Sequence, residues 1–238
     1  MAPTYIFSKA LPSDSGAIAA ILAMSWVSPF SRLQFGCVDP SALAAAMMPR
    51  ITQQITDASM LFHVARRSDT QEIVSVAQWT EPSGAPDAAM EESAKEREER
   101  QKFEDEVYYN SLPEDCNRRL VMEFTTGLRT LRERVLCGRR HFLLENLATH
   151  PDHRGQGLAR QLIERALVDA DEQSVLVYLD TASDNSAAHL YKRLGFEEQG
   201  RQTIENLGRF VGEAELERSG AGNEHTHVAF VRCPTSKV

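Results

Sequence analysis

The chain has 238 residues, of which 42% are hydrophobic and 25% are charged, and its formal net charge is −8. This composition is that of an ordinary globular protein, which can bury a core without disulfides or metals. The acidic balance argues against a nucleic-acid partner. No signal-peptide pattern begins the sequence, and no stretch approaches the roughly 18 apolar residues of a membrane span. We therefore expect a soluble intracellular protein without a membrane partner, cytoplasmic by default and with the nucleus left open.

The cysteines are scattered along the chain and form no CxxC pair: Cys37, Cys116, Cys137 and Cys233. Such spacing gives little support to a zinc site or to a disulfide framework. We expect reduced, mostly buried thiols.

The first 80 residues predict a strand, two helices and a hairpin. Tyr5–Phe7 is typical of a short strand, and Pro12–Asp14 supplies N-cap chemistry for a first helix. Asp39–Ser41 opens a second helix, because Asp39 can cap it and Pro40 suits its first turn. Leu61–Arg66 and Ile73–Trp79 are predicted strands, and the polar turn between them indicates a hairpin.

Residues 80–140 differ in character from what surrounds them. Glu81–Pro86 is a cluster of helix and strand breakers. Glu91–Glu106 is dense in charge of both signs, which favours a solvated helix held by i,i+4 pairs over a partner-binding surface. Asp115–Cys137 carries one apolar stripe at helical spacing, and Gly138 is its expected C-cap.

The rest of the chain alternates strands and helices. The predicted strands are Phe142–Thr149, Val175–Asp180, Phe196–Thr203 and His227–Arg232, and the predicted helices are Gly157–Ala170 and Asn185–Leu194. This alternation favours an α/β or α+β sheet with helices on its faces.

The most informative segment is the turn from Arg154 to Ala159. A strand ends before it and a helix begins inside it, so successive backbone N–H groups lack helical partners and can converge on an anion. Gly155 and Gly157 allow close approach of a pyrophosphate, and Arg154 adds a cation. The turn fits neither G-x-G-x-x-G nor G-x-x-x-x-G-K-[ST]. The alternative is an ordinary strand–helix turn whose glycines tighten the packing.

Two motifs together resemble a known family. Arg154, Gly157 and Ala159 fill the defined positions of [QR]-x-x-G-x-[GA], and Leu190–Phe196 resembles the signature LYxxxGF. They match in order and spacing over about residues 142–198, whereas the first 80 residues fit only in outline. The chain thus resembles the GNAT (GCN5-related N-acetyltransferase) superfamily.

The resemblance implies one domain over residues 1–238. Its fold class would be α/β (α+β), with a mixed, mostly antiparallel sheet of six to seven strands splayed between strands 4 and 5. Helices would lie on both faces, with a helical insertion at about 80–140 and a CoA-binding core at about 141–200. The insertion could cover the acceptor entrance, make a dimer contact or decorate the edge, and monomer or homodimer stays open.

The resemblance also implies acetyl-CoA as co-substrate and no metal. Backbone groups of Leu147 and Thr149 would pair with the pantetheine arm, which Asn185 and Ser186 would also contact. The pyrophosphate would be held by the backbone N–H groups of Arg154, Gly155, Gln156, Gly157, Leu158 and Ala159.

Tyr191 fills the position of the family's usual acid, which protonates the departing thiolate. A phenol with a pKa near ~10 is protonated at neutral pH and is a competent donor. The alternative is a ring that only packs on the sheet.

Glu145 is the candidate base. Period-two alternation predicts one shared face for His141, Leu143, Glu145 and Leu147. A carboxylate in this apolar strand is costly without a task or a partner, and partial burial would raise its pKa. The alternative is an ion pair with a neighbouring arginine.

Histidines and aromatic residues complete the candidates. His150 with His153, and His225 with His227, lack a third ligand at metal spacing, so no metal is expected. His225 or His227 could line an acceptor pocket, as could Trp26, Phe30, Phe35 and Trp79, although core packing is the simpler interpretation for each aromatic residue.

We therefore predict an N-acetyltransferase that acts on a small-molecule amine. The alternatives are a protein or peptide amine as acceptor, and a CoA-binding module that has lost catalysis.

Overall fold

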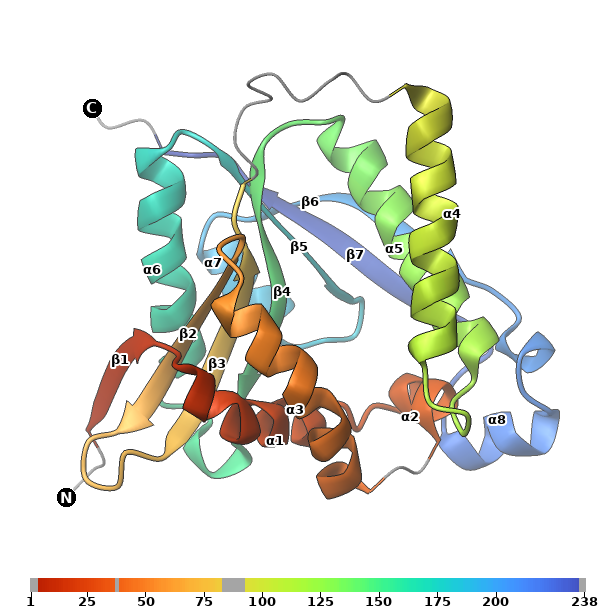
Figure 1. The fold of residues 1–238 in the computed structure, drawn as a ribbon, viewed down its shortest axis with the longest axis horizontal. Coiled ribbons are helices and arrows are strands. Elements are labelled where there is room, and N and C mark those ends of the chain that lie inside the picture. The colour runs from red at the N-terminus through yellow and green to blue at the C-terminus, as the bar shows by residue number, and fades with distance from the viewer. Residues whose placement is uncertain (1–3, 37–38, 83–92, 236–238) are drawn as a thin grey trace.

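The computed structural model describes residues 4–36, 39–82 and 93–235, which form a seven-stranded mixed sheet with helices around it (Figure 1). In spatial order, the strands are β1 (Tyr5–Lys9), β2 (Met60–Arg67), β3 (Ile73–Thr80), β4 (His141–Thr149), β5 (Leu176–Ala182), β7 (His225–Arg232) and β6 (Glu197–Ile204). Every neighbouring pair is antiparallel except β4 and β5, which are parallel. The predicted fold class is confirmed.

The sheet opens between β4 and β5. Their pairing covers only three positions, from His141 opposite Leu176 to Leu143 opposite Tyr178. Beyond these positions β4 continues along β3 as far as Thr149, while β5 continues along β7. The facing edges of the two strands then have no strand partner, and this is the predicted splay.

The helices are α1 (Ser15–Ser25), α2 (Pro29–Phe35), α3 (Pro40–Thr56), α4 (Ala94–Ser111), α5 (Arg118–Leu136), α6 (Leu158–Glu172), α7 (Ala188–Arg193) and α8 (Glu213–Ser219). Short 3-10 turns occur at Pro12–Asp14, Pro151–His153 and Leu207–Arg209. The sequence did not predict α2 or α8, which have seven residues each and are too short for a visible period. Among the described residues, no single helix is long and apolar enough to cross a bilayer; only the bent pair Pro12–Ser25 and Pro29–Phe35 meets those criteria jointly.

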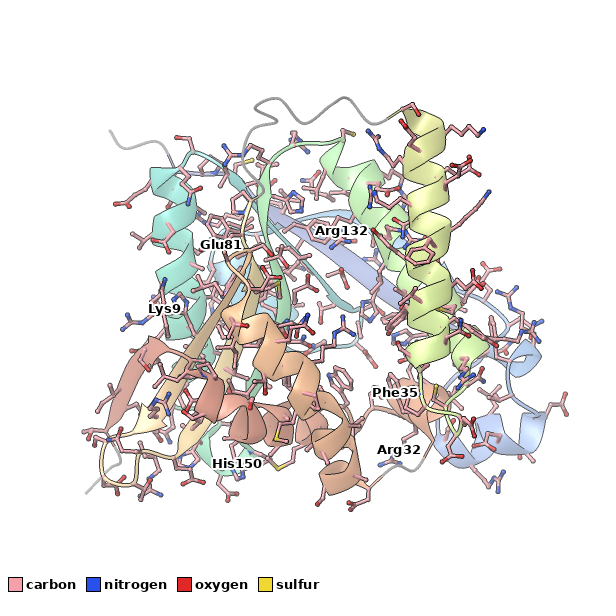
Figure 2. The ribbon with its side chains drawn as sticks, viewed as in Figure 1. Lys9, Arg32, Phe35, Glu81, Arg132 and His150 are labelled. Atoms are coloured by element: carbon pink, nitrogen blue, oxygen red, sulfur yellow. The ribbon has the colours of Figure 1, made fainter. Side chains whose placement is uncertain are left out.

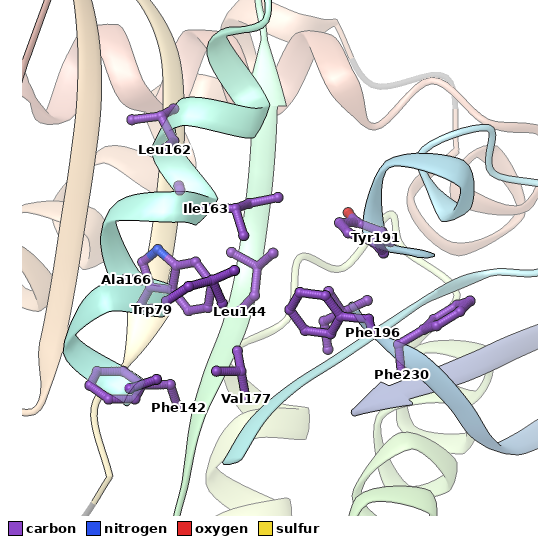
Figure 3. Close-up of a cluster of buried hydrophobic side chains, with 14 of the residues drawn as sticks. Trp79, Phe142, Leu144, Leu162, Ile163, Ala166, Val177, Tyr191, Phe196 and Phe230 are labelled. Atoms are coloured by element: carbon purple, nitrogen blue, oxygen red, sulfur yellow. The ribbon is translucent and has the colours of Figure 1, made fainter. Parts of the chain in front are cut away.

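Two groups of helices cover the two faces of the sheet. On one face, Ile18 of α1 and Ile51 of α3 pack near Ala148, and Leu131 of α5 packs near Leu143. On the other face, α6 and α7 enclose the largest cluster, where Leu162, Ile163 and Tyr191 lie over Trp79, Phe142, Leu144 and Phe230 (Figure 3). The site described below lies where β4 and β5 separate between these layers.

The predicted insertion contains two helices with different roles. α4 begins with a capping box of Ser93 and Glu96 and carries an ion pair of Glu98 with Lys102 at 2.7 Å. The predicted solvated helix is thus confirmed from Ala94 onward, and residues 91 and 92 lie outside the described residues. α5 instead packs its apolar stripe on the sheet, and Arg129 of α5 holds Asp105 of α4 through two contacts of 2.8 Å. The insertion is therefore not a mere edge decoration, because α5 covers one face.

The free cysteines correct one prediction. Cys116 is buried, and burial raises the pKa of its thiol, but Cys137 and Cys233 are exposed. Cys37 lies outside the described residues. The expectation of mostly buried thiols is wrong for Cys137 because this residue forms the left-handed C-cap of α5, with φ 49°, just before Gly138.

Candidate functional site: the splayed sheet and the glycine turn

The glycine turn leaves backbone donors unused. Gly155 and Gly157 have φ values of 76° and 74°, in the left-handed region, and a Cβ atom at either would meet nothing within 4 Å. Glycine is thus required by the backbone conformation, while the space above the turn is open. Among the described residues, the N–H groups of Gly155, Gln156 and Gly157 have no backbone or side-chain acceptor. With the N-terminus of α6 behind them, they form a cradle for an anion.

A hollow of about 410 Å³ lies over this turn. It runs from Thr149 and the turn itself to Leu190 and Arg193 of α7. Arg154 and Arg160 also line it, so three guanidinium groups border the space, one of which is paired with Glu164 at 2.7 Å. Open volume, unpaired N–H groups and positive charge together fit the pyrophosphate of CoA.

The free edge of β4 presents alternate peptide groups to the gap. The His150 N–H donates to the Val74 carbonyl at 2.8 Å, and the Ala148 carbonyl accepts from the Ser75 hydroxyl at 2.9 Å, so these positions turn toward β3. His150 follows the last residue of β4 (Figure 2). Because peptide groups alternate along a strand, those of Leu147 and Thr149 turn toward the gap. The geometry suits the predicted pairing with pantetheine, which itself stays a prediction.

Asn185 and Ser186 lie in the turn before α7, which begins at Ala188 and not at Asn185 as predicted. The Asn185 amide donates to the Thr181 hydroxyl at 2.8 Å, and its oxygen accepts from the Ala187 N–H at 2.9 Å. These bonds hold the turn and delay the helix. Ser186 is exposed. A contact of either residue with CoA stays a prediction.

Tyr191 is 5% exposed and comes from α7. Its ring lies near those of Phe196 and Phe230, with centroid distances of 6.0 and 6.1 Å (Figure 3). Burial, together with the nearby Asp180 carboxylate, raises the pKa of Tyr191 to about 12. The phenol therefore remains protonated throughout the neutral range. The ring packs on the sheet, and the acid role stays a prediction compatible with that packing.

Glu145 differs from its expected environment. Gln78 pairs with Asn146 and Trp79 pairs with Leu144, so Glu145 is the extra residue of a β-bulge. Its side chain is exposed and accepts a hydrogen bond of 2.8 Å from the Thr80 hydroxyl. The expected partial burial is wrong, and Thr80, not an arginine, is the partner of Glu145 within the part of the chain that is described.

The bulge also changes which residues share a face. Leu143 packs with Leu131 of α5, whereas Leu147 packs with the cluster under α6 and α7. The single face predicted for His141, Leu143, Glu145 and Leu147 is therefore wrong, because one inserted residue reverses the alternation.

A second group of side chains lies on the α5 side of the opening. The His227 Nδ1 is 3.0 Å from Asp180 Oδ1. His225 stacks on Phe30 with a centroid distance of 3.6 Å, and Phe124 lies edge-on to His227 at 4.8 Å. The sequence indicated both histidines and Phe30 as pocket candidates. It did not indicate Asp180 or Phe124, whose positions depend on strand register and on the docking of α5.

The other aromatic candidates lie in two different places in the fold. Trp79 is fully buried in the cluster under α6, which confirms core packing as the simpler interpretation and removes it from the pocket candidates. Trp26 and Phe35 stack with a centroid distance of 5.7 Å beside α2, with Phe35 at the helix end (Figure 2). Within residues 4–36, 39–82 and 93–235, no three His, Cys, Asp or Glu side chains come together as a metal site would require.

Comparison with known proteins defines the class. Residues 122–198 match the family model described as "Acetyltransferase (GNAT) domain". The chain is 34% identical over 65 residues to the L-amino acid N-acyltransferase MnaT of Escherichia coli (strain K12). That match covers 26% of this chain and 38% of the relative's length.

Solved structures share the fold over nearly the whole chain. Arylalkylamine N-acetyltransferase 2 from Aedes aegypti has a TM-score of 0.60 at 12% identity, covering 98% of this chain and 100% of that one. A Corynebacterium glutamicum structure named for histone acetyltransferase HPA2 and related acetyltransferase has a TM-score of 0.53 at 21% identity, covering 100% and 99%. The splayed sheet and glycine turn are those of an acetyltransferase fold. Residues 122–198 thus match the GNAT acetyltransferase domain, and the chain as a whole shares the fold of the solved acetyltransferases.

Proposed function

We propose that the protein is an acetyl-CoA-dependent N-acetyltransferase that acetylates a primary amine of a small molecule by direct attack. The observation that carries the proposal is the cradle of unpaired N–H groups at Gly155–Gly157, which opens into a hollow beside the free edge of β4. A diphosphate followed by an amide-containing arm has the chemistry for both features.

In this proposal each part of the site has one task. The turn Arg154–Ala159 binds the pyrophosphate, and the peptide groups of Leu147 and Thr149 hold the arm along β4. Tyr191 donates its proton to the sulfur as the thiolate leaves, since its raised pKa keeps it protonated. Binding thereby orients the thioester beside the gap, where the acceptor amine can reach it.

Two observations support a small-molecule acceptor. The relative from Escherichia coli is named for L-amino acids, and the structure from Aedes aegypti is named for arylalkylamines. On the α5 side of the opening, Phe124 and His225 pack against the buried Phe30, and an aromatic cluster of this kind suits a compact amine. A peptide amine is the second candidate, supported by the name of the Corynebacterium glutamicum structure.

Titration calorimetry with acetyl-CoA, followed by an assay of free-thiol release, tests the proposal. Saturable binding and a melting temperature that rises with ligand concentration are expected. The enzyme should then release CoA faster with small amines as acceptors than with peptides that carry free N-termini or lysines. Faster release with peptides would favour the second candidate, binding without release would leave a CoA-binding module, and no binding at millimolar acetyl-CoA would refute the proposal.

A further inference from the structure

A histidine–carboxylate pair crosses the two strands next to the gap. Asp180 on β5 lies opposite Ala229 on β7, and His227 lies opposite Ala182, so the two side chains are diagonal neighbours. Their side chains are 18% and 16% exposed, and Asp180 Oδ1 is 3.0 Å from His227 Nδ1. The pair is thus sheltered but still accessible to a small molecule.

The contact fixes which nitrogen carries the proton. A carboxylate only accepts, so Nδ1–H donates to Asp180 and the other ring nitrogen, Nε2, keeps its lone pair. Among the described residues, Nε2 of His227 has no hydrogen-bond partner. A neutral imidazole held in this tautomer can take a proton from a substrate.

The pair stands at the opening of the sheet. Tyr178 is the last residue of β5 that pairs with β4, and Asp180 comes two positions later on the same face. Tyr178 and Ala229 pack on that face with Leu131 of α5, whereas Tyr191 belongs to the cluster on the opposite face. The pair and the phenol therefore flank the gap from its two sides.

Glu145 is less well placed for the same task. It projects from the bulge of β4, and its carboxylate accepts a hydrogen bond from Thr80 on β3. β3 is the neighbour of β4 on the side away from β5. The hydrogen bond thus ties the carboxylate to the side of β4 that is remote from the gap.

We propose that His227 is the general base of the acetyl transfer and that Asp180 is the positioning residue that holds its tautomer. The proposal rests on the proposed function and deepens it. His227 Nε2 takes a proton from the acceptor nitrogen as the N–C bond to the acyl carbon forms. The C–S bond breaks, and the sulfur takes the proton of Tyr191. Solvent carries the proton on the imidazolium back to the phenolate, which leaves an amide and free CoA.

The surroundings of His227 decide which groups can contribute to the pH dependence of the rate. The titratable groups that face it are Asp180 on β5, His225 on β7 and, through His225, Asp184 in the loop after β5. Burial, together with His227, lowers the pKa of His225 to about 4, so His225 is neutral in any practical assay. From α5, Phe124 contacts His227, and Gln202 of β6 lies opposite it, while Phe30 of α2 stacks on His225; none of these three is charged. The charged groups that α5 brings to this face are Arg132 and Arg134, which act on Tyr178.

The test compares the pH dependence of kcat/KM for the wild type, H227Q and D180N. The wild-type rate should fall at low pH through one ionisation. In H227Q, kcat should fall by about 10²- to 10⁴-fold, and the low-pH ionisation should be absent. The Kd of H227Q for acetyl-CoA should stay within twofold of wild type. D180N should lower kcat by less than H227Q does, because the imidazole remains but its tautomer is no longer held.

H141Q is the matched control, because His141 is a partly buried histidine at the paired end of β4. It should keep the wild-type pH profile. Retention of the low-pH ionisation and of most of kcat in H227Q would overturn the proposal. So would loss of that ionisation in E145Q alone, which would assign the base to Glu145.

NMR of the His227 ring nitrogens gives a readout that needs no substrate. In the wild type the proton of the neutral ring should lie on Nδ1, which faces Asp180, and D180N should lose this preference; an unchanged tautomer would overturn the role of Asp180. Failure of the wild type to bind acetyl-CoA would refute the proposed function. Normal turnover by a correctly folded H227Q variant would refute only the assignment of the base.

Discussion

Substitution of Gly157 by valine should separate strain in the turn from loss of the ligand site. Gly157 has φ 74°, and a Cβ atom there meets no protein atom within 4 Å. Gly138 has φ 75° and is equally open, but it follows α5, far from the turn in the sequence. Each substitution should cost about 1–2 kcal/mol, because an L-residue is forced into the left-handed region. That corresponds to a fall in Tm of about 2–8 °C for a chain of this size.

Only G157V should also weaken the binding of acetyl-CoA. The new side chain would occupy the space where the pyrophosphate approaches the N–H groups of the turn. Loss of one hydrogen bond to a charged group costs about 1.5–3 kcal/mol, which raises Kd by roughly 10- to 100-fold. Calorimetry on both variants, with Tm measured in parallel, gives the comparison. Equal Kd values for G157V, G138V and wild type would refute the assignment of the anion cradle.

Three further outcomes follow from the contacts described above. Tyr191→Phe should lower kcat by about 10²- to 10⁴-fold while leaving the Kd for acetyl-CoA unchanged, and equal loss of both in kinetics and calorimetry would make Tyr191 structural. The Arg232 guanidinium holds the pKa of Asp171 at about 2, so the carboxylate contributes stability fully above its unfolded pKa of about 4 and loses it as pH falls toward 2. Asp171→Asn should therefore lower Tm near neutral pH and flatten the acid dependence of unfolding below about pH 4. Arg129→Ala removes both contacts to Asp105 and should speed proteolysis within α4 without changing CoA binding.

Local patterns in the sequence were sufficient to predict the geometry of the glycine turn. Gly155 and Gly157 are separated by one residue and precede a helix, and the structure gives both a left-handed backbone with open space above. The donors are main-chain N–H groups, so their placement depends on local turn geometry and not on distant packing. The strand order could not be read in this way, but the resemblance to the family supplied the splay between β4 and β5.

The errors at Glu145 have a single physical origin. Strict alternation assumes one residue per pairing position, and the bulge between Leu144 and Asn146 breaks that assumption. Nothing in the segment from Phe142 to Leu147 marks the extra residue, because bulges depend on the partner strand as much as on their own sequence. The expected burial and the expected face of Glu145 both failed for this reason.

The pair of His227 and Asp180 could not be predicted from the sequence for a different reason. The two residues are 47 positions apart, and they meet only because β7 returns antiparallel beside β5 in one register. A shift of one residue would turn His227 to the opposite face of the sheet. Side-chain sites that join distant strands therefore require the register, whereas a main-chain cradle does not.

The contrast between main-chain and side-chain sites also indicates which residues would determine the choice of acceptor amine. The proposed CoA side is built from main-chain groups of the turn and of β4, within residues 122–198 that match the family model. The opposite side is built from side chains: Phe30 comes from α2, outside that match, and Phe124 comes from α5. If the proposed function holds, changes in these aromatic residues would alter the amine site while the cradle stays intact. Phe30 and Phe124 are therefore the positions at which substitution should change the preferred amine without changing the affinity for acetyl-CoA.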